Sequence, residues 1–322
     1  MSDPRTRVQE HLSRHNWGFL SHQGYVLGLD LGGYGVRLAL VDLEHHTCHT
    51  AHIDIEQRHP QHVLDASKAL MHSFLHNQGV TPDRLIRIAV GFGGPINPLD
   101  GRIRLSPRMP DWEGFSLKEY YEQAFDTSTI VENNANLIAL AEATFGIGQG
   151  CAHLFYLHLS SGVGGGMVLD GRLYQGSTAA AGEIGHAVVS HHLDQTPAMA
   201  TLEQLVSVNA LLRRAEMLGL TTNDLNDLFT DHAAGQQVIH EAVDVLGLRL
   251  AQVIALLDPQ MVVLGGIVVR IGGEPFVQAL SAQVGRYMRA PFTKPVPIAA
   301  SVLGVESIAI GAVALALLSL QA

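Results

Sequence analysis

Apolar residues occur in short runs separated by glycine-rich turns, and their spacing alternates between the strand period and the helix period. Two apolar runs between Tyr25 and Leu43 flank the turn GGYG, which predicts a hairpin of two buried strands. A helix is predicted where apolar positions repeat every three to four residues, over residues 62–78. The same criteria predict further strands at 47–55, 87–91 and 128–132, and helices at 116–124 and from Asn133 or Asn134 to Phe145.

The second half of the chain repeats this arrangement. A strand LFYLHL is followed by the glycine loop SSGVGGG, a strand MVL and the tight-turn pair Asp170-Gly171. Two strand, glycine loop, strand units in one chain indicate duplicated halves and an α/β fold. The remaining elements are predicted as helices at 202–218, 236–257 and 275–288, a strand MVVLGG between the last two helices, and a strand near 296–302.

These elements predict two lobes. We expect an N-terminal α/β lobe over residues 25–132, a C-terminal α/β lobe over 133–304 and a closing helix over 305–322. Residues 1–24 show no clean period, so we expect an extension without a complete DNA-binding domain. The apolar stretch 307–320 is short for a bilayer span, which favours a buried helix and no membrane association.

Composition narrows the class of protein. A formal net charge of −10 and a pI near 5.9 over 322 residues argue against broad attraction to nucleic acid, so we expect no direct nucleic-acid binding by this chain. Cys48 and Cys151 are too few and too far apart for a disulfide framework. The N-terminus lacks the apolar core of a secretory signal. We therefore expect a cytoplasmic protein.

Each glycine turn has a functional and a structural interpretation. Asp30 ends a predicted strand beside GGYG, where backbone N–H groups can approach a phosphate and the carboxylate can hold hydrated Mg²⁺. An ordinary hairpin turn explains the same residues. The second loop, residues 160–166, is equally ambiguous, because it lacks the Gly-Lys-Ser/Thr ending of a P-loop and the helix-opening context of a dinucleotide fingerprint.

The order of several short motifs is more specific than any one of them. Taken together, they resemble the ROK family (repressor, open reading frame, kinase) over about residues 25–320. The resemblance implies an actin/hexokinase-like (ribonuclease H-like) fold, with two α/β lobes and a cleft for sugar and ATP. The motifs are Gly32-Gly33, Pro95, Glu132-Asn133, Gly162 to Gly166, Gly182-Glu183-Ile184-Gly185-His186, Asp258-Pro259 and Leu264-Gly265-Gly266.

The resemblance assigns roles to individual residues. Phosphate and ATP contacts fall on Asp30, Gly32 and Gly33, on Ser161, Gly162 and Gly164, and on Gly265 and Gly266. Carboxylate, amide and imidazole groups supply the mixed acceptors and donors that a polyhydroxyl ligand needs. The matching sugar-binding residues are Asn133, Glu183, His186 and Glu203.

Two departures from the family pattern affect the chemistry. Asn134 stands where family kinases carry the aspartate that acts as catalytic base, and Tyr34 stands where a small threonine is usual. A general base contributes roughly 10²–10⁴ in rate, and an amide has almost no basicity. The amide can still hydrogen-bond a sugar hydroxyl, so Asn134 remains a sugar-binding candidate. A helix N-cap is the structural alternative, because Asn and Asp cap about equally well.

Two further departures concern ligands. Arg108 lies near a family sugar-binding asparagine, so it either binds an anionic sugar or is an ordinary solvated arginine. The loop after His186 lacks the cysteines of the family zinc site, so we expect that zinc to be absent and assign no metal ligands. His191, His192 and Asp194 either join His186 in a replacement site or form a polar loop.

The sequence therefore favours a ROK sugar-binding and sensing protein, kinase-derived and catalytically impaired, that acts in transcriptional regulation of carbohydrate metabolism. Family resemblance adds an expected homodimer, while no cofactor is certain and ATP with Mg²⁺ stays open. One alternative is an active ATP-dependent sugar kinase that phosphorylates the 6-position of a hexose or N-acyl-hexosamine with a displaced base, for which Asp111 is the nearby candidate. Another is an ATP-binding protein without a sugar ligand.

Overall fold

The computed structural model describes residues 3–15, 17, 24–32, 35–56, 59–106, 111–193, 196–288 and 294–321, without the side chains of 190–199. The chain forms two compact units. Unit 1 comprises Met1–Gly150, Gln175–Ala180 and Val302–Ala322, and unit 2 comprises Cys151–Tyr174 and Ala181–Ser301.

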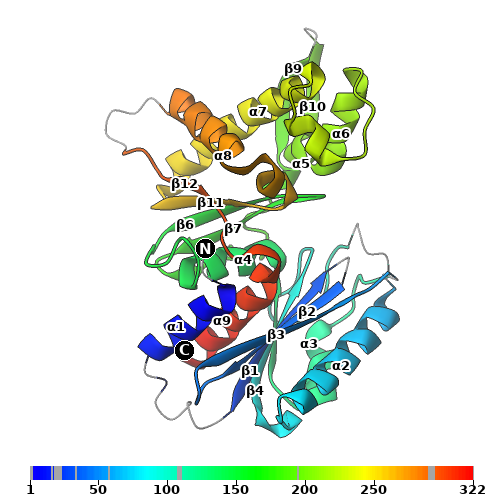
Figure 1. Ribbon diagram of the computed structural model, residues 1–322, viewed down its shortest axis with the longest axis vertical. Helices are drawn as coiled ribbons and strands as arrows, with labels where there is room; N and C mark the ends of the chain where they lie inside the picture. Colours follow the sequence, from blue (N-terminus) through cyan, green and yellow to red (C-terminus); the bar gives the residue numbers. More distant parts are fainter. Residues whose placement is uncertain are drawn as a thin grey trace. The chain divides into compact units, whose positions relative to one another are not determined.

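Unit 1 is built on a mixed five-stranded sheet. Helices α2 and α3 cover one face, while α9, which also packs on α4, covers the other (Figure 1). Cover on both faces explains why the strands are nearly continuous apolar runs. The strand order is β3 (Thr47–Asp54), β2 (Gly35–Asp42), β1 (Tyr25–Gly32), β4 (Leu85–Phe92) and β5 (Thr129–Asn133), with β1, β4 and β5 parallel. The helices are α2 (Pro60–Asn77), α3 (Leu117–Phe125), α4 (Asn134–Thr144) and α9 (Ser307–Gln321).

Small residues allow α9 to lie close to its neighbours. A Cβ atom at Gly28 of β1 would lie 2.1 Å from the carbonyl oxygen of Ala309 in α9. Among the described residues one stretch, Gly304–Gln321, has the length and mean hydropathy (1.7) of a membrane span, but 50% of it is buried in the protein. Buried helices of soluble proteins can have the same length and hydropathy as a membrane span. Helix α9 packs like such a core helix, because it contacts β1, β2 and β4.

Unit 2 repeats the sheet topology of unit 1. Its β6, β7, β8, β11 and β12 pair in the same order and with the same parallel and antiparallel relations as β1, β2, β3, β4 and β5. The predicted duplication is therefore confirmed. The strands are β6 (Leu154–Leu159), β7 (Val163–Leu169), β8 (Arg172–Leu173), β11 (Met261–Gly265) and β12 (Ile298–Ala300), and the helices are α5 (Leu202–Val206), α6 (Val208–Met217), α7 (Ala233–Leu257) and α8 (Ile267–Tyr287).

Short 3-10 helices complete both units. They are η2 (Pro82–Arg84) and η5 (Gly304–Glu306) in unit 1, and η3 (Ile184–His186) and η4 (Leu225–Phe229) in unit 2.

The N-terminal segment contains a helix that the sequence did not indicate. Helix α1 spans Pro4–Arg14, is capped by the Asp3 side chain, and buries Val8 and Leu12 against unit 1. It contacts β3 and α9 (Figure 1). Two buried apolar residues four positions apart are enough to hold this short helix on the protein, because its other face is in contact with water.

Several predicted boundaries were wrong. The segment after His186 forms a hairpin of β9 (Val188–Leu193) and β10 (Thr196–Thr201) instead of a loop. Strand β7 begins at Val163, four residues before the predicted strand, so most of the glycine run is strand. Helix α8 was predicted to begin at residue 275. It begins at Ile267, because the helix continues across a kink at Gly273. Helix α4, expected to open the second lobe, lies in unit 1.

Candidate functional site

In unit 1, polar residues lie in one row across the carboxyl ends of the parallel strands. Register pairing places Asp30 of β1 opposite Gly91 of β4, and Gly91 opposite Glu132 of β5. Ligands of α/β sheets bind at this end of the strands. The sheet therefore brings together residues that are about 60 and 100 positions apart in sequence.

Asp30 is buried and incompletely paired. Its side chain is 4% exposed, and its Oδ1 atom has no hydrogen-bond partner among the described residues. Burial raises the pKa of Asp30 to about 7, and the positive charge of Arg37 opposes that rise. An unpaired buried carboxylate oxygen beside the glycine turn fits a ligand for Mg²⁺ or its hydration water.

Asn133 is the N-cap of α4. Its Oδ1 accepts from the backbone N–H of Ala135 at 2.8 Å, and its Nδ2 donates to the carbonyl of Gly94 at 3.0 Å. The cap is therefore Asn133, and capping does not explain Asn134. Both polar ends of Asn133 already have protein partners, which leaves one N–H and one lone pair for a ligand.

Asn134 occupies the first helical position of α4. Its Oδ1 is buried without a hydrogen-bond partner in the described part of the chain. A Cβ atom at Gly91 would lie 3.0 Å from this oxygen, and one at Gly93 would lie 3.5 Å from Nδ2. The amide thus lies against the glycine backbone at the end of β4, in the same region as the Asp30 row.

A hydrogen-bond network around Glu132 escaped the sequence-based site prediction. Glu132 is 4% exposed, and its Oε1 accepts from the N–H of Asn133 and from Asn136 Nδ2, while Oε2 accepts from Gln175 Nε2. The four-residue spacing of Glu132 and Asn136 on a strand-to-helix junction was the available signal. Gln175 could not be found this way, because it comes from a separate segment of unit 1.

In unit 2, the predicted sugar-binding residues gather at the start of β7. The Oε2 atom of Glu203 accepts from the N–H of Val163 at 2.9 Å. The Nε2 atom of His186 lies 3.6 Å from Glu183 Oε2, on the short helix η3. Gly185, between these two, passes so close to β7 that a Cβ atom there would lie 2.0 Å from the carbonyl of Val163. The start of β7 thus contacts Glu203 directly and, through Gly185, the segment that carries Glu183 and His186.

The second glycine segment is a tight turn. Gly162 accepts from the N–H of Ser160 at 3.0 Å, so only residues 160–162 connect β6 to β7. Gly164 already lies within β7, opposite His158. The turn exposes Ser161 and leaves it next to the Glu203 contact.

Gly265 and Gly266 end β11 and begin α8. Gly266 has a positive φ of 93°, and a Cβ atom there would lie 2.1 Å from the carbonyl of Leu159. Only glycine combines that backbone angle with that approach. Its N-cap position leaves the first N–H groups of α8 without a side-chain cap, an arrangement that attracts anions.

Some predicted site residues lie outside the described part of the chain. These are Gly33, Tyr34, Arg108 and Asp194, and the side chains of His191 and His192 are likewise not described. Asp111 is exposed, with a positive φ of 69°. Among the described residues, no group of three potential metal ligands comes together.

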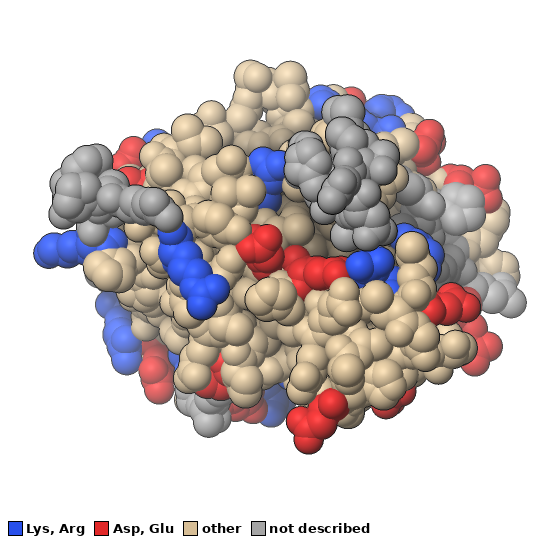
Figure 2. All heavy atoms as spheres, turned by 90° about the horizontal axis from the view of Figure 1, so that it is seen from above, with Lys and Arg blue, Asp and Glu red and all other residues tan. Residues whose placement is uncertain are grey.

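Charged side chains do not form a continuous basic surface on the face shown in Figure 2, as far as the described residues go. Lys and Arg lie among Asp and Glu and are separated by uncharged residues (Figure 2).

The sequence matches the ROK family over residues 26–318. This chain belongs to the ROK family. The glucokinase of Thermotoga maritima is 28% identical over 245 residues, which cover 70% of this chain and 77% of that protein. The DNA-binding transcriptional dual regulator NagC of Escherichia coli is 27% identical over 308 residues, covering 90% of this chain and 75% of the regulator.

A solved structure supports the same assignment. The ROK hexokinase of Thermus thermophilus superimposes with a TM-score of 0.80 at 28% identity, covering 92% of this chain and 99% of that one. The actin/hexokinase-like fold expected from the sequence is therefore confirmed. ROK relatives include both sugar kinases and regulators, so membership alone does not choose between them.

Proposed function

We propose that this ROK protein binds a sugar and acts as a sensor in the transcriptional regulation of carbohydrate metabolism, with little or no phosphotransfer. The observation that carries the proposal is Asn134, an amide at the start of α4 where family kinases have a catalytic base. Its unpaired buried oxygen is available to a ligand hydroxyl. It cannot take up the proton that an attacking hydroxyl must lose.

Groups that can bind a sugar occur in each unit. In unit 1, Asn133 retains one N–H and one lone pair. In unit 2, Glu183, His186 and Glu203 supply two carboxylates and an imidazole near the start of β7. Vicinal hydroxyls donate and accept at once, so they suit groups of both kinds. A sugar derivative is the proposed signal, and a partner protein or second subunit is the proposed receiver.

ATP with Mg²⁺ is the proposed nucleotide if one binds. In unit 1, Asp30 would hold the hydrated cation beside Gly32. In unit 2, the turn at Ser161 and the start of α8 at Gly266 are the segments proposed to bind phosphate. When bound, Mg²⁺ neutralises phosphate charge. The protein itself would contribute the buried carboxylate of Asp30.

An active sugar kinase is the second candidate, and similarity to the Thermotoga maritima glucokinase and the Thermus thermophilus hexokinase favours it. It requires a displaced base. Glu132 is already occupied by three donors. Asp111 is exposed and would have to reach the sugar, so the geometry supports the sensor better.

A paired binding and turnover screen separates these functions. Pentoses, hexoses, hexosamines and N-acyl-hexosamines would be tested by thermal shift and by coupled ADP release with the unmodified protein. The sensor predicts stabilisation by at least one sugar without ADP release. Sugar-dependent ADP release would support the kinase, and the lack of any thermal shift would contradict sugar binding.

A matched pair of variants assigns the site. His186→Gln should weaken sugar binding by about ten-fold or more, because a ligand hydrogen bond is lost. His153→Gln is the control, since His153 Nε2 also lies near a carboxylate, 3.5 Å from Asp170 Oδ1, but away from the start of β7. If both substitutions weakened sugar binding equally, His186 would not be a sugar-binding residue.

A further inference from the structure

Unit 1 contains a pocket that the proposed sugar and nucleotide sites do not use. It has a volume of ≈ 180 Å³, enough for several water molecules or a small ligand. Strands β2 and β3 form one wall and η5 forms the other. The lining residues are Arg37, Leu38, Thr50, Ala51, His52, Val305 and Glu306.

Two nitrogen-bearing side chains project from one row of the sheet. Arg37 of β2 pairs in register with His52 of β3 and, on its other side, with Asp30 of β1. Directly opposite residues of antiparallel strands present their side chains on the same face. Within the described residues, no hydrogen bond or ion pair engages the Arg37 guanidinium or the His52 ring, so their N–H groups are available to a ligand.

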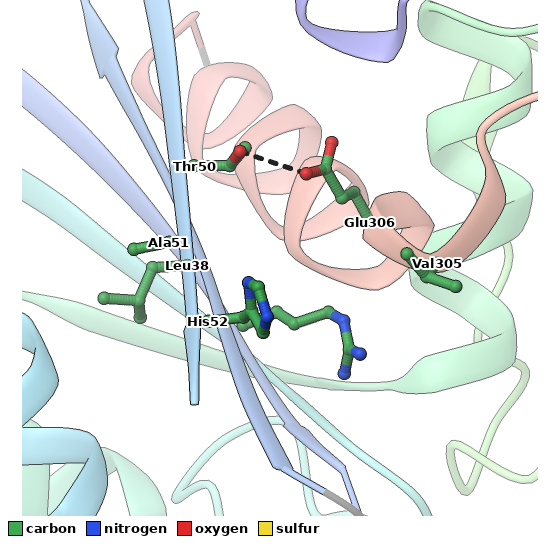
Figure 3. Close-up of a pocket in the computed structure, with 7 residues that line it drawn as sticks. Leu38, Thr50, Ala51, His52, Val305 and Glu306 are labelled. Carbon is green, nitrogen blue, oxygen red and sulfur yellow. Dashed lines mark hydrogen bonds between the residues drawn. The ribbon is translucent and has the colours of Figure 1, made fainter. Parts of the chain in front are cut away.

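The opposite wall supplies an oriented acceptor. The hydroxyl of Thr50 donates to Glu306 Oε1 at 3.0 Å, which fixes the carboxylate. In Figure 3 the side chains of Thr50 and His52 point toward Glu306 and Val305, whereas Leu38 and Ala51 point to the other side of the strands. Val305 is 58% exposed and lies at the rim of the pocket.

These groups define the chemistry of a ligand. A guanidinium and an imidazole beside each other suit an oxyanion, which Arg can bind with two parallel hydrogen bonds. A carboxylate across the pocket would repel a bare anion but accept from a hydroxyl. We propose that this pocket binds a small hydroxylated metabolite that carries a phosphate or carboxylate group, with the anion on Arg37 and His52 and a hydroxyl on Glu306.

The pocket also adjoins the row that contains Asp30. Arg37 pairs in register with Asp30 of β1 on one side and with His52 of β3 on the other. The same arginine therefore lies next to both the pocket and the Asp30 site.

Titration calorimetry at constant ionic strength tests the proposal with three probes: inorganic phosphate, glucose 6-phosphate and gluconate. Arg37→Gln removes the anion contact, and Val305→Trp fills the rim and keeps Arg37, His52 and Glu306 in the chain. Arg270→Gln is the matched control, because it removes an exposed arginine of α8 in unit 2.

We expect saturable binding of at least one hydroxylated probe, weakened about ten-fold or more by Arg37→Gln and by Val305→Trp and unchanged by Arg270→Gln. A preference for glucose 6-phosphate assigns a phosphate ligand, and a preference for gluconate assigns a carboxylate. The proposal is overturned if no probe binds saturably, or if binding survives both pocket substitutions. Circular dichroism spectra of the variants would show that they are folded.

Discussion

At the scale of single residues, Asp30 shows how the site is built at a cost to stability. Its carboxyl is buried with one oxygen unpaired, and burial raises its pKa from 3.8 to about 7. Between these pH values the unfolded chain has released the proton while the folded protein retains it. Stability contributed by this group is therefore lost as pH rises from about 4 to about 7, and it levels off above that.

Replacing Asp30 by Asn should make the protein more stable at pH 8 in the presence of a chelator, because the buried negative charge disappears. The gain is at most about 4 kcal/mol, since each pKa unit corresponds to about 1.36 kcal/mol, and it should vanish at pH 4. Urea unfolding at several pH values measures it. Asp83→Asn, at an exposed carboxyl, should show no such trend; a gain for Asp30→Asn that does not depend on pH would contradict the burial argument.

At the scale of elements, close packing of α9 determines where small residues must stand. A Cβ atom at Gly311 of α9 would lie 2.1 Å from the carbonyl oxygen of Leu137 in α4. This oxygen belongs to the backbone of α4, so it cannot move aside as the end of a flexible side chain could. The glycine therefore sets the distance between α9 and the helix that carries Asn134.

Gly311→Ala should lower the free energy of unfolding by about 1–3 kcal/mol through overpacking. Gly285→Ala is the matched control, because no atom lies within 4 Å of its added Cβ in helix α8. That control should be neutral or stabilising by about 0.5–1 kcal/mol. Thermal denaturation compares the two, and an equally tolerated Gly311→Ala would show that α9 is not packed this closely.

Glu142 of α4 holds two segments near the boundaries of unit 1. The fully buried carboxylate accepts from the N–H of Ile147 at 3.0 Å and of Val302 at 3.1 Å. The chain leaves unit 1 after Gly150 and, apart from Gln175–Ala180, belongs to unit 2 until it returns at Val302. Glu142 therefore fixes both segments from within unit 1.

Glu142→Ala should destabilise the protein by about 1–3 kcal/mol, because the N–H groups of Ile147 and Val302 lose their acceptor. Glu142→Gln should cost less, since its amide keeps one oxygen acceptor. Chemical denaturation provides the measurement. Glu119→Ala, at an exposed ion pair with Arg102, should change stability by no more than about 1 kcal/mol; an equally small effect at Glu142 would refute the anchoring role.

Elements with long apolar runs could be predicted from the sequence, and those held mainly by tertiary contacts could not. Strands β1 and β2 and helix α7 follow directly from their apolar positions. Helix α1 was missed because Val8 and Leu12 alone mark its buried face. The β9 and β10 hairpin was missed because HHLDQTPA does not show regular alternation.

The sequence suggested candidate site residues by identity, and it did not show how they are arranged. Adjacent asparagines at 133 and 134 look alike in sequence, and only the backbone shows that Asn133 caps α4. The row of Asp30, Gly91 and Glu132 depends on which distant strands pair. Pairing of that kind is not encoded in a local pattern.

At the scale of the whole molecule, our proposal is that a duplicated ROK fold binds a sugar and lacks the base for phosphotransfer. Replacing Asn134 by Asp places a carboxylate in the first turn of a helix, where the helix dipole favours a negative charge, although burial of the oxygen opposes it. Asn134→Asp is a chemical test of the proposal: restored phosphotransfer would show that the rest of the kinase site is intact. A variant that still lacks activity would place a second defect elsewhere in the site.

The most direct measurement of the central claim is the rate of sugar-dependent ADP formation by the unmodified protein, at a sugar concentration that saturates binding. The account predicts a rate at the background of a sugar-free control, although the sugar is bound. Turnover at the rate of ordinary sugar kinases, roughly 1–100 per second, would contradict it.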